Sequence, residues 1–164
     1  MDYVKLRIYL LLSCLVILAA CASNQVKGKP PFVGISSMIA KGDSLASTFD
    51  IHNINDVKLD IDGVDIEIRV QDTVLVHYAS GFQRTIDPNT TEEASFEQAA
   101  DSTARQLLTD LESGSVSSLP FSLDGRVHTP SDGYLSFKNE GHLYPVPGRP
   151  GQFRSASARA RERR

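Results

Sequence analysis

A dense set of chemically active side chains lies near the middle of this sequence. Four carboxylates fall within eight residues, at Asp60, Asp62, Asp65 and Glu67, around Gly63. Carboxylate oxygens at alternate positions are the ligands with which calcium loops surround Ca²⁺. Here apolar residues separate the acids, and the third Asp is displaced from its place in such a loop. A strand that carries these acids on its solvent face therefore explains the spacing better than a calcium site.

The histidines and serines have none of the spacings that zinc binding or nucleophilic catalysis uses. The four histidines are far apart in the sequence, whereas zinc ligands often follow one another at short intervals. No Gly-x-Ser-x-Gly turn and no phosphate-binding glycine-rich loop occurs, and the acids form no isolated pair in an apolar setting. The sequence therefore predicts a protein that is not an enzyme and needs no metal ion or cofactor. Its histidines, His52, His77, His128 and His142, are expected on the surface or half buried.

Cys21 follows a segment with the layout of a secretion signal. Lys5 and Arg7 precede an apolar run from Ile8 to Ala20 that only Ser13 interrupts. The run is shorter than the roughly 20 residues that a membrane-spanning helix needs. We therefore expect residues 1–20 to form a signal-peptide helix that is removed. The alternatives are ordinary cleavage to a secreted protein and retention of the run as an anchor.

The junction Leu18-Ala19-Ala20-Cys21 resembles the lipobox of bacterial lipoproteins, in which a large apolar residue and two small ones precede an obligatory cysteine. The resemblance implies a diacylglyceryl group on the Cys21 sulfur, cleavage before Cys21, and acylation of the freed amine. Two or three acyl chains hold a protein durably, since each buried methylene contributes about 0.8 kcal/mol. Residue 22 is Ala and not the Asp that usually retains lipoproteins in the inner membrane. We therefore expect an outer-membrane protein, anchored by lipid on Cys21 and facing the periplasm.

The charge of the mature chain is divided between its body and its end. Residues 21–148 hold 9 Lys and Arg against 18 Asp and Glu, whereas residues 149–164 hold six Arg and one Glu. An acidic body argues against nucleic acid as a partner, because phosphate binding depends on Lys and Arg. The end from Arg154 onward has little apolar bulk and is predicted to be disordered. A solvated end is preferred over a segment that binds anionic lipid.

Composition divides the chain into four parts. Residues 1–20 are the signal peptide, and residues 21–31 form a short polar tether behind the lipid. Residues 32–143 form one domain, and residues 144–164 are a Pro-rich arm followed by the basic tail. The arm either docks a partner in extended form or lies along the edge of the domain.

Alternating polar and apolar residues predict strands through most of the domain. The odd positions are apolar in residues 57–61 and the even positions in residues 64–70, so Gly63 is expected to mark a kink between two strands. Further strands are predicted at residues 45–51, 73–78, 82–86, 119–127 and 134–137.

One segment has a helical period instead. Ala104, Leu107, Leu108 and Leu111 share one helical face, with Asp101 or Ser102 as N-cap and Gly114 as terminator. About seven short antiparallel strands with one short helix indicate an all-β fold, a fibronectin-III or immunoglobulin-like β-sandwich.

Roughly residues 33–141 resemble the late-embryogenesis-abundant type 2 family, also called the water-stress and hypersensitive-response (WHy) domain. The resemblance rests on a strand that enters an Asn53-Ile54-Asn55 turn, two alternating stretches around Gly63, and a later Leu-x-Gly-x-Val ending at residues 123–127. It implies a fibronectin-III-like sandwich without enzymatic activity that is associated with desiccation, osmotic or other stress. We expect a lipid-anchored protein of stress protection or envelope maintenance. The alternative is a binding module or accessory subunit that docks a protein partner in the envelope, in an oligomeric state that the sequence does not define.

Overall fold

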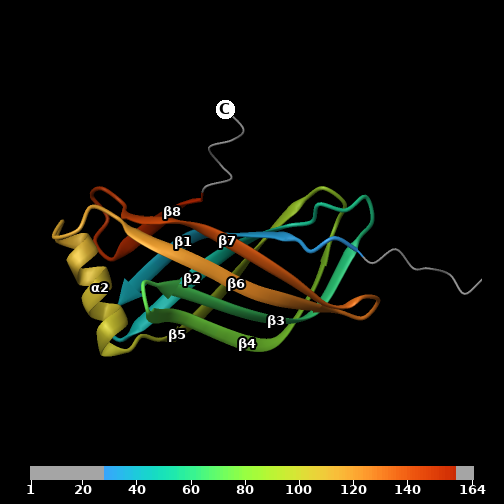
Figure 1. The fold of residues 1–164 in the computed structure, drawn as a ribbon, viewed down its shortest axis with the longest axis horizontal. Coiled ribbons are helices and arrows are strands. Elements are labelled where there is room, and N and C mark those ends of the chain that lie inside the picture. The colour runs from blue at the N-terminus through green and yellow to red at the C-terminus, as the bar shows by residue number, and fades with distance from the viewer. Residues whose placement is uncertain (1–27, 158–164) are drawn as a thin grey trace, which may run out of the picture.

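The computed structural model describes residues 28–157, which fold into eight strands and one helix (Figure 1). The elements are β1 (Phe32–Lys41), β2 (Ser44–His52), β3 (Leu59–Val70), β4 (Thr73–Ile86), β5 (Thr91–Ala99), α2 (Ser102–Glu112), β6 (Leu119–Thr129), β7 (Gly133–Pro145) and β8 (Gln152–Ser157). Every strand and the helix contribute at least one buried apolar side chain to one core. Within the described residues, no helix is long and apolar enough to cross a bilayer.

All eight strands belong to one antiparallel sheet in the order β4-β3-β6-β7-β8-β1-β2-β5. The sheet coils until it is a nearly closed barrel, with its two halves facing each other across the core (Figure 1). The expectation of an all-β antiparallel fold with one short helix is confirmed. The expected division into two separate sheets is replaced by continuous pairing, because β8 joins β7 to β1.

The junction between β8 and β1 depends on side chains as well as on backbone pairing. Only Met38 and Ile39 of β1 are paired with β8. Further along β1, the Asn139 amide donates to the Val33 carbonyl oxygen at 3.0 Å, and the Ser155 hydroxyl donates to the Ile35 carbonyl oxygen at 2.6 Å. Buried carbonyls that no strand reaches are thereby satisfied.

The two edge strands, β4 and β5, approach each other without forming a backbone ladder. The Gln98 side chain of β5 joins them: its oxygen accepts from the His77 backbone N–H at 3.2 Å, and its amide donates to the Leu75 carbonyl oxygen at 3.1 Å. Between the strands, the Phe96 ring stacks on Tyr78 with centroids 3.8 Å apart and lies edge-on to Phe82 at 5.6 Å. One amide and three aromatic rings therefore close this side of the barrel.

Strand β3 contains the predicted change of parity at Gly63. Leu59 and Ile61 point into the core before it and Val64, Ile66, Ile68 and Val70 after it. The pairing with β4 shifts register between Ile61 and Gly63, where Phe82 and Gln83 of β4 lie opposite Asp62 alone, so the extra residue of this β-bulge belongs to β4. The change of parity is confirmed, within one long strand instead of between two. Likewise, β4 is a single strand through Ser80 and Gly81, where the sequence predicts two runs.

The predicted helix is confirmed as α2, which covers one end of the barrel (Figure 1). The Asp101 carboxylate caps it by accepting from the Ala104 backbone N–H at 2.7 Å. Gly114 follows the last turn with a φ of +80°, a conformation that favours glycine. Ala104, Leu108 and Leu111 are buried against the barrel.

The fold extends past residue 143, where the sequence predicts that the domain ends. Strand β7 continues to Pro145, the Pro-rich residues 146–151 form the turn into β8, and β8 pairs with β7 as far as Ser157. Phe153 is 1% exposed in the core. The predicted disorder from Arg154 onward is therefore wrong for Arg154–Ser157. These residues bury little apolar surface, but their backbone hydrogen bonds with β7 hold them in the sheet. Residues 158–164 lie outside the described residues.

Candidate functional site

The predicted lipid-attachment site, Cys21, and the predicted signal peptide, residues 1–20, lie outside the described residues. The description begins at Gly28, within the segment predicted as a tether. Lys29 already contacts the domain: its backbone N–H donates to the Asn55 side-chain oxygen at 2.8 Å, and its carbonyl oxygen accepts from the Asn55 amide at 2.9 Å. The last residues of the predicted tether are therefore fixed to the barrel beside the turn at residues 53–55.

The acidic run forms the outer face of β3, as the strand interpretation predicts. Each carboxylate has a partner on a neighbouring residue or strand, and none is oriented into a loop. The Asp60 carboxylate accepts from the Thr85 hydroxyl at 2.6 Å, and Glu67 pairs with Arg69. Across residues 28–157, no three His, Cys, Asp or Glu side chains are grouped to hold a metal ion.

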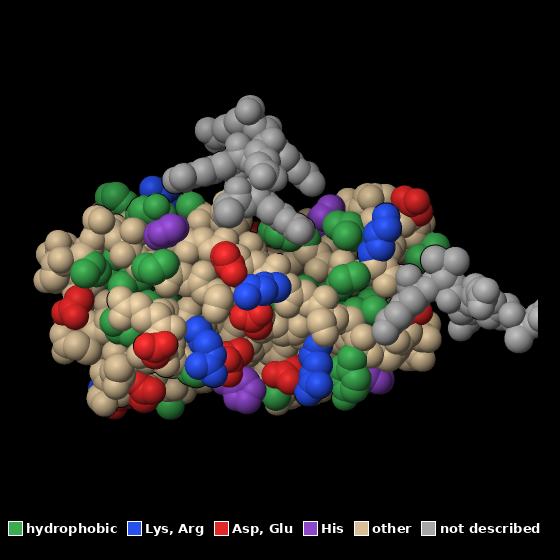
Figure 2. All heavy atoms as spheres, in the orientation of Figure 1, with side chains coloured by type: hydrophobic (Ala, Val, Ile, Leu, Met, Phe, Trp, Pro, Cys, Tyr) green, Lys and Arg blue, Asp and Glu red, His purple; other side chains and the backbone are tan. Residues whose placement is uncertain are grey.

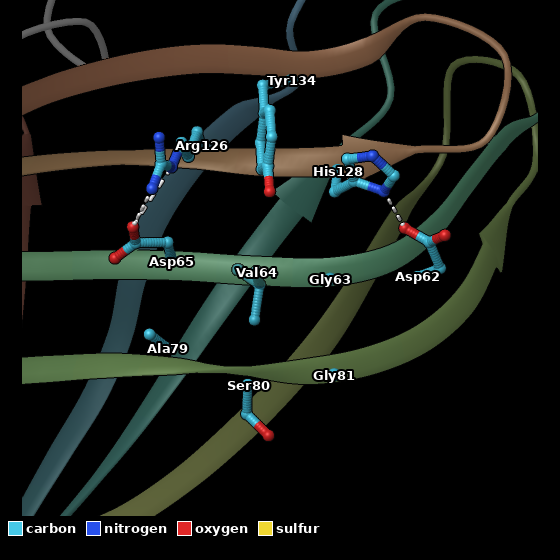
Figure 3. Close-up of a pocket in the computed structure, with 10 residues that line it drawn as sticks. All are labelled: Asp62, Gly63, Val64, Asp65, Ala79, Ser80, Gly81, Arg126, His128 and Tyr134. Atoms are coloured by element: carbon cyan, nitrogen blue, oxygen red, sulfur yellow. Dashed lines mark hydrogen bonds and ion pairs between the residues drawn. The ribbon is translucent and has the colours of Figure 1, made fainter.

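A shallow hollow of about 390 Å³ lies on the outer face of β3, β4, β6 and β7 and is lined by several polar side chains (Figure 3). We call it the acid–base hollow. Its walls are the side chains of Asp62, Asp65, Arg126, His128 and Tyr134, and its floor is formed by residues 63–64 and 79–81.

The strand register creates this hollow. Gly63 pairs with Gly81 on one side and with His128 on the other, and His128 in turn pairs with Tyr134. Four strands therefore contribute one row across the sheet, with two bulky rings on β6 and β7 and two glycines on β3 and β4. Because the glycines have no side chains and the rings of His128 and Tyr134 rise beside them, the surface is hollowed over β3 and β4.

Two acid–base pairs form its walls. The His128 Nδ1 lies 2.5 Å from the Asp62 carboxylate. The Asp65 carboxylate receives the Arg126 guanidinium through Nη2 at 3.1 Å and Nε at 3.2 Å, and the His77 Nε2 lies 3.4 Å from its other oxygen. These side chains remain one-third to three-fifths exposed, so the pairs order the surface more than they stabilise the fold.

Tyr134 projects between these pairs (Figure 3) and is 58% exposed. The Arg126 guanidinium lies over the Tyr134 ring, 4.7 Å from its centroid. The His128 and Tyr134 rings pack edge to face, with centroids 4.8 Å apart. Contacts of this kind hold an exposed ring in place without burying it. The result is a fixed aromatic ring with a donor and an acceptor on each side, an arrangement suited to binding.

The hollow does not assemble a serine nucleophile. The Asp62–His128 pair resembles the base and orienting acid of a hydrolase, and Ser80 also lines the hollow. However, Ser80 pairs with Val64, whose side chain points into the core, so the Ser80 hydroxyl lies on the opposite face of the sheet from His128 (Figure 3).

All four histidines lie where the sequence predicts, on the surface or half buried. His52 lies within 3.0–3.1 Å of the Thr91 hydroxyl and the Thr90 carbonyl, and His142 packs loosely beside Tyr144. The sequence does not reveal that His77 and His128 share one face with Asp62 and Asp65. Their proximity follows from the register between strands, which the amino-acid sequence does not indicate.

A second feature that the sequence does not mark as a site is the buried Asn53, which is 0% exposed. Its amide donates to the carbonyl oxygens of Val57 at 2.8 Å, Ile86 at 3.1 Å and Asp87 at 3.2 Å. Its oxygen accepts from the backbone N–H and from the side-chain amide of Asn55, both at 3.0 Å. Asn53 therefore joins the β2–β3 and β4–β5 connections, and through Asn55 it also holds Lys29.

Comparison with known proteins places the fold. No family model and no curated protein matches the sequence. Among solved structures, AT1g01470 from Arabidopsis thaliana has a TM-score of 0.55 at 8% identity, and the match covers 80% of this chain and 93% of that one. A late embryogenesis abundant (LEA) protein, At2g46140.1, has a TM-score of 0.39 at 14% identity, covering 88% and 87%. A protein from Archaeoglobus fulgidus has a TM-score of 0.42 at 11% identity, covering 70% and 96%.

One of these three structural neighbours is thus described as an LEA protein. At these identities the likeness to AT1g01470 defines the fold alone, and the two lower TM-scores add nothing to it. The class defined is an all-β, barrel-like domain.

Proposed function

We propose that this chain is a non-enzymatic, lipid-anchored outer-membrane protein whose LEA type 2 (WHy) domain faces the periplasm and protects the envelope during desiccation, osmotic or related stress. The anchor is lipid on Cys21, in the place that the sequence Leu18-Ala19-Ala20-Cys21 gives it.

One observation carries the family part of the proposal: the residues on which the sequence resemblance rests occupy positions with strict structural demands. Asn53 makes five hydrogen bonds while fully buried, and Gly63 lies beside the register shift between β3 and β4. At Gly125, a Cβ would lie 2.5 Å from the Asp65 carbonyl oxygen and 2.5 Å from the Phe137 ring. A pattern shared at constrained positions supports common ancestry better than a pattern of exposed residues does.

The surface of the domain supports a protective role. Residues 28–157 carry 18 Asp and Glu against 10 Lys and Arg. Figure 2 shows charged side chains spread over one face, with acidic and basic groups side by side near its middle. A compact body with excess negative charge and no large apolar surface on this face can keep neighbouring molecules apart without sticking to them.

Survival after stress tests this proposal. A strain that lacks the protein is complemented with the wild type, with Cys21→Ser, or with Cys14→Ser as the matched control, since Cys14 belongs to the predicted signal. We expect viable counts after drying and salt shock to fall on deletion, to recover with wild type and Cys14→Ser, and to stay low with Cys21→Ser. Unchanged survival on deletion would remove the support for a protective role.

The acid–base hollow favours a second candidate, a binding module of an envelope complex. An exposed ring flanked by hydrogen-bonding pairs is typical of interaction surfaces. Crosslinking in intact envelopes, with wild type beside Tyr134→Ala, tests it, and Val116→Ala is the control because Val116 is exposed elsewhere. A stoichiometric partner that Tyr134→Ala loses and Val116→Ala keeps would favour the module over the protectant.

A further inference from the structure

The end of the barrel where the described chain begins carries two exposed apolar side chains. Val57 is 66% exposed and Ile54 is 38% exposed, and both lie on the connection between β2 and β3. Phe32 pairs with His52, so this connection lies at the end where β1 begins, whereas the β1–β2 turn that packs near α2 lies at the other end (Figure 1). We call residues 53–58 the entry loop.

The entry loop is held in one shape. Asn53 bonds the Val57 carbonyl within the loop and the Ile86 and Asp87 carbonyls across it. Because these bonds fix the backbone, Val57 cannot fold back onto the barrel at low cost. Its exposure is therefore a property of the native loop, and it leaves an apolar tip facing outward.

A lipid on Cys21 would be tethered close to this loop. Lys29 is bonded to Asn55, so the chain enters the domain at the loop itself. Between Cys21 and Gly28 the chain can span at most about 25 Å, at roughly 3.5 Å per residue. The nine residues of β2 run for about 30 Å along the strand, which is roughly 20–25 Å along the barrel axis once strand tilt is included. The helix α2 adds about 10 Å at the far end. An orientation with α2 against the membrane would place Gly28 beyond that reach.

We propose that the entry loop contacts the lipid bilayer, with Ile54 and Val57 as the apolar contacts, so that the barrel stands on this end and α2 points away from the membrane. The inference rests on the proposed lipid anchoring at Cys21. The bilayer is the occupant because the anchor would confine this end, and no other, to the membrane surface.

The charged side chains around the entry loop give it no net positive charge, so we expect the contact with the bilayer to be apolar and not electrostatic. Lys58 pairs with Asp87 at 3.3 Å, and Asn89 donates to the Asp56 carboxylate at 3.4 Å. Lys29 is a further basic residue at this end, and Asp132 lies beside Gly28. Acids outnumber bases among these side chains, so contact should not require anionic lipid and should not weaken as salt rises.

The chain contains no Trp, so a single introduced Trp reports directly on the contact. The lipidated mature protein, residues 21–164, is reconstituted in phosphatidylcholine vesicles that contain brominated lipid, with either Val57→Trp or Val116→Trp. Val116 is the matched control because it is 36% exposed and lies beside α2, where its backbone N–H bonds the Asp110 carbonyl. We expect blue-shifted, strongly quenched emission from Val57→Trp and unquenched emission from Val116→Trp, at both low and high salt.

A second variant separates the loop's contribution from the reporter's own affinity for membranes. Adding Ile54→Asp to Val57→Trp should lower the quenched fraction on the order of tenfold, from lost apolar contact and the added charge. Vesicle flotation is measured on the same samples. Flotation without preferential quenching at residue 57 would overturn this inference alone, whereas loss of flotation would overturn the anchoring and the inference together.

Discussion

Replacing Asn53 with Ala should destabilise the domain more than truncating any other buried polar side chain of residues 28–157. The side chain is fully buried and makes five hydrogen bonds, three as donor and two as acceptor. A net contribution of about 1 kcal/mol per bond, with shared donors counted partly, gives a loss of about 4 kcal/mol. For a chain of this length, that corresponds to a fall in Tm of roughly 10 °C or more.

The assay is urea unfolding of the mature chain with Cys21→Ser, so that no lipid is present. Asn139→Ala is the matched control, because Asn139 is also a buried Asn, 6% exposed, but makes two hydrogen bonds. We expect it to cost about 2 kcal/mol, about half the cost of Asn53→Ala. If Asn53→Ala cost less than about 1 kcal/mol, or no more than Asn139→Ala, the hydrogen-bond network would not have the importance assigned to it.

The remaining predictions concern the effect of three substitutions and one truncation on the stability of the domain. Gly125→Ala forces a Cβ to within 2.5 Å of the Asp65 carbonyl oxygen and should cost more than about 3 kcal/mol in urea unfolding, or prevent folding. Ser47→Ala should raise the free energy of unfolding by about 1 kcal/mol, since the Ser47 hydroxyl is buried without a hydrogen-bond partner. A clear loss of stability would show that the hydroxyl has such a partner. Phe153→Ala should cost about 4 kcal/mol if β8 belongs to the core. Deleting residues 158–164 should leave the urea midpoint unchanged, and a lowered midpoint would show that these residues contribute to the fold.

The sequence predicts well the elements whose apolar residues recur with a regular period, and it misses β1, whose buried Val33, Ile35 and Met38 lie on either side of an irregularity. β3 alternates on either side of Gly63, β6 alternates along most of its length, and α2 has both a helical period and a capping Asp101. β5 escapes prediction because Ala94 and Phe96 are its main inward-facing apolar residues among acids and small side chains. β8 escapes for the same reason, since Phe153 is its one large apolar side chain and its pairing with β7 holds the remainder in place.

The acid–base hollow could not be predicted from the sequence for a different reason. Its contacts join Asp62 to His128 and Asp65 to Arg126, residues more than sixty positions apart. Such proximity depends on the register between β3 and β6, which places Gly63 opposite His128 and Asp65 opposite Arg126. The outward direction of the acids could be predicted from local alternation, but their partners could not.

Lipid attachment at Cys21 is best tested by the intact mass of the mature protein from fractionated membranes, wild type beside Cys21→Ser. We expect a wild-type mass of residues 21–164 plus two or three acyl chains, found in the outer-membrane fraction, and no such mass in the Cys21→Ser variant. An unlipidated mass for the wild type would contradict the anchor, and with it the proposed location and orientation of the domain.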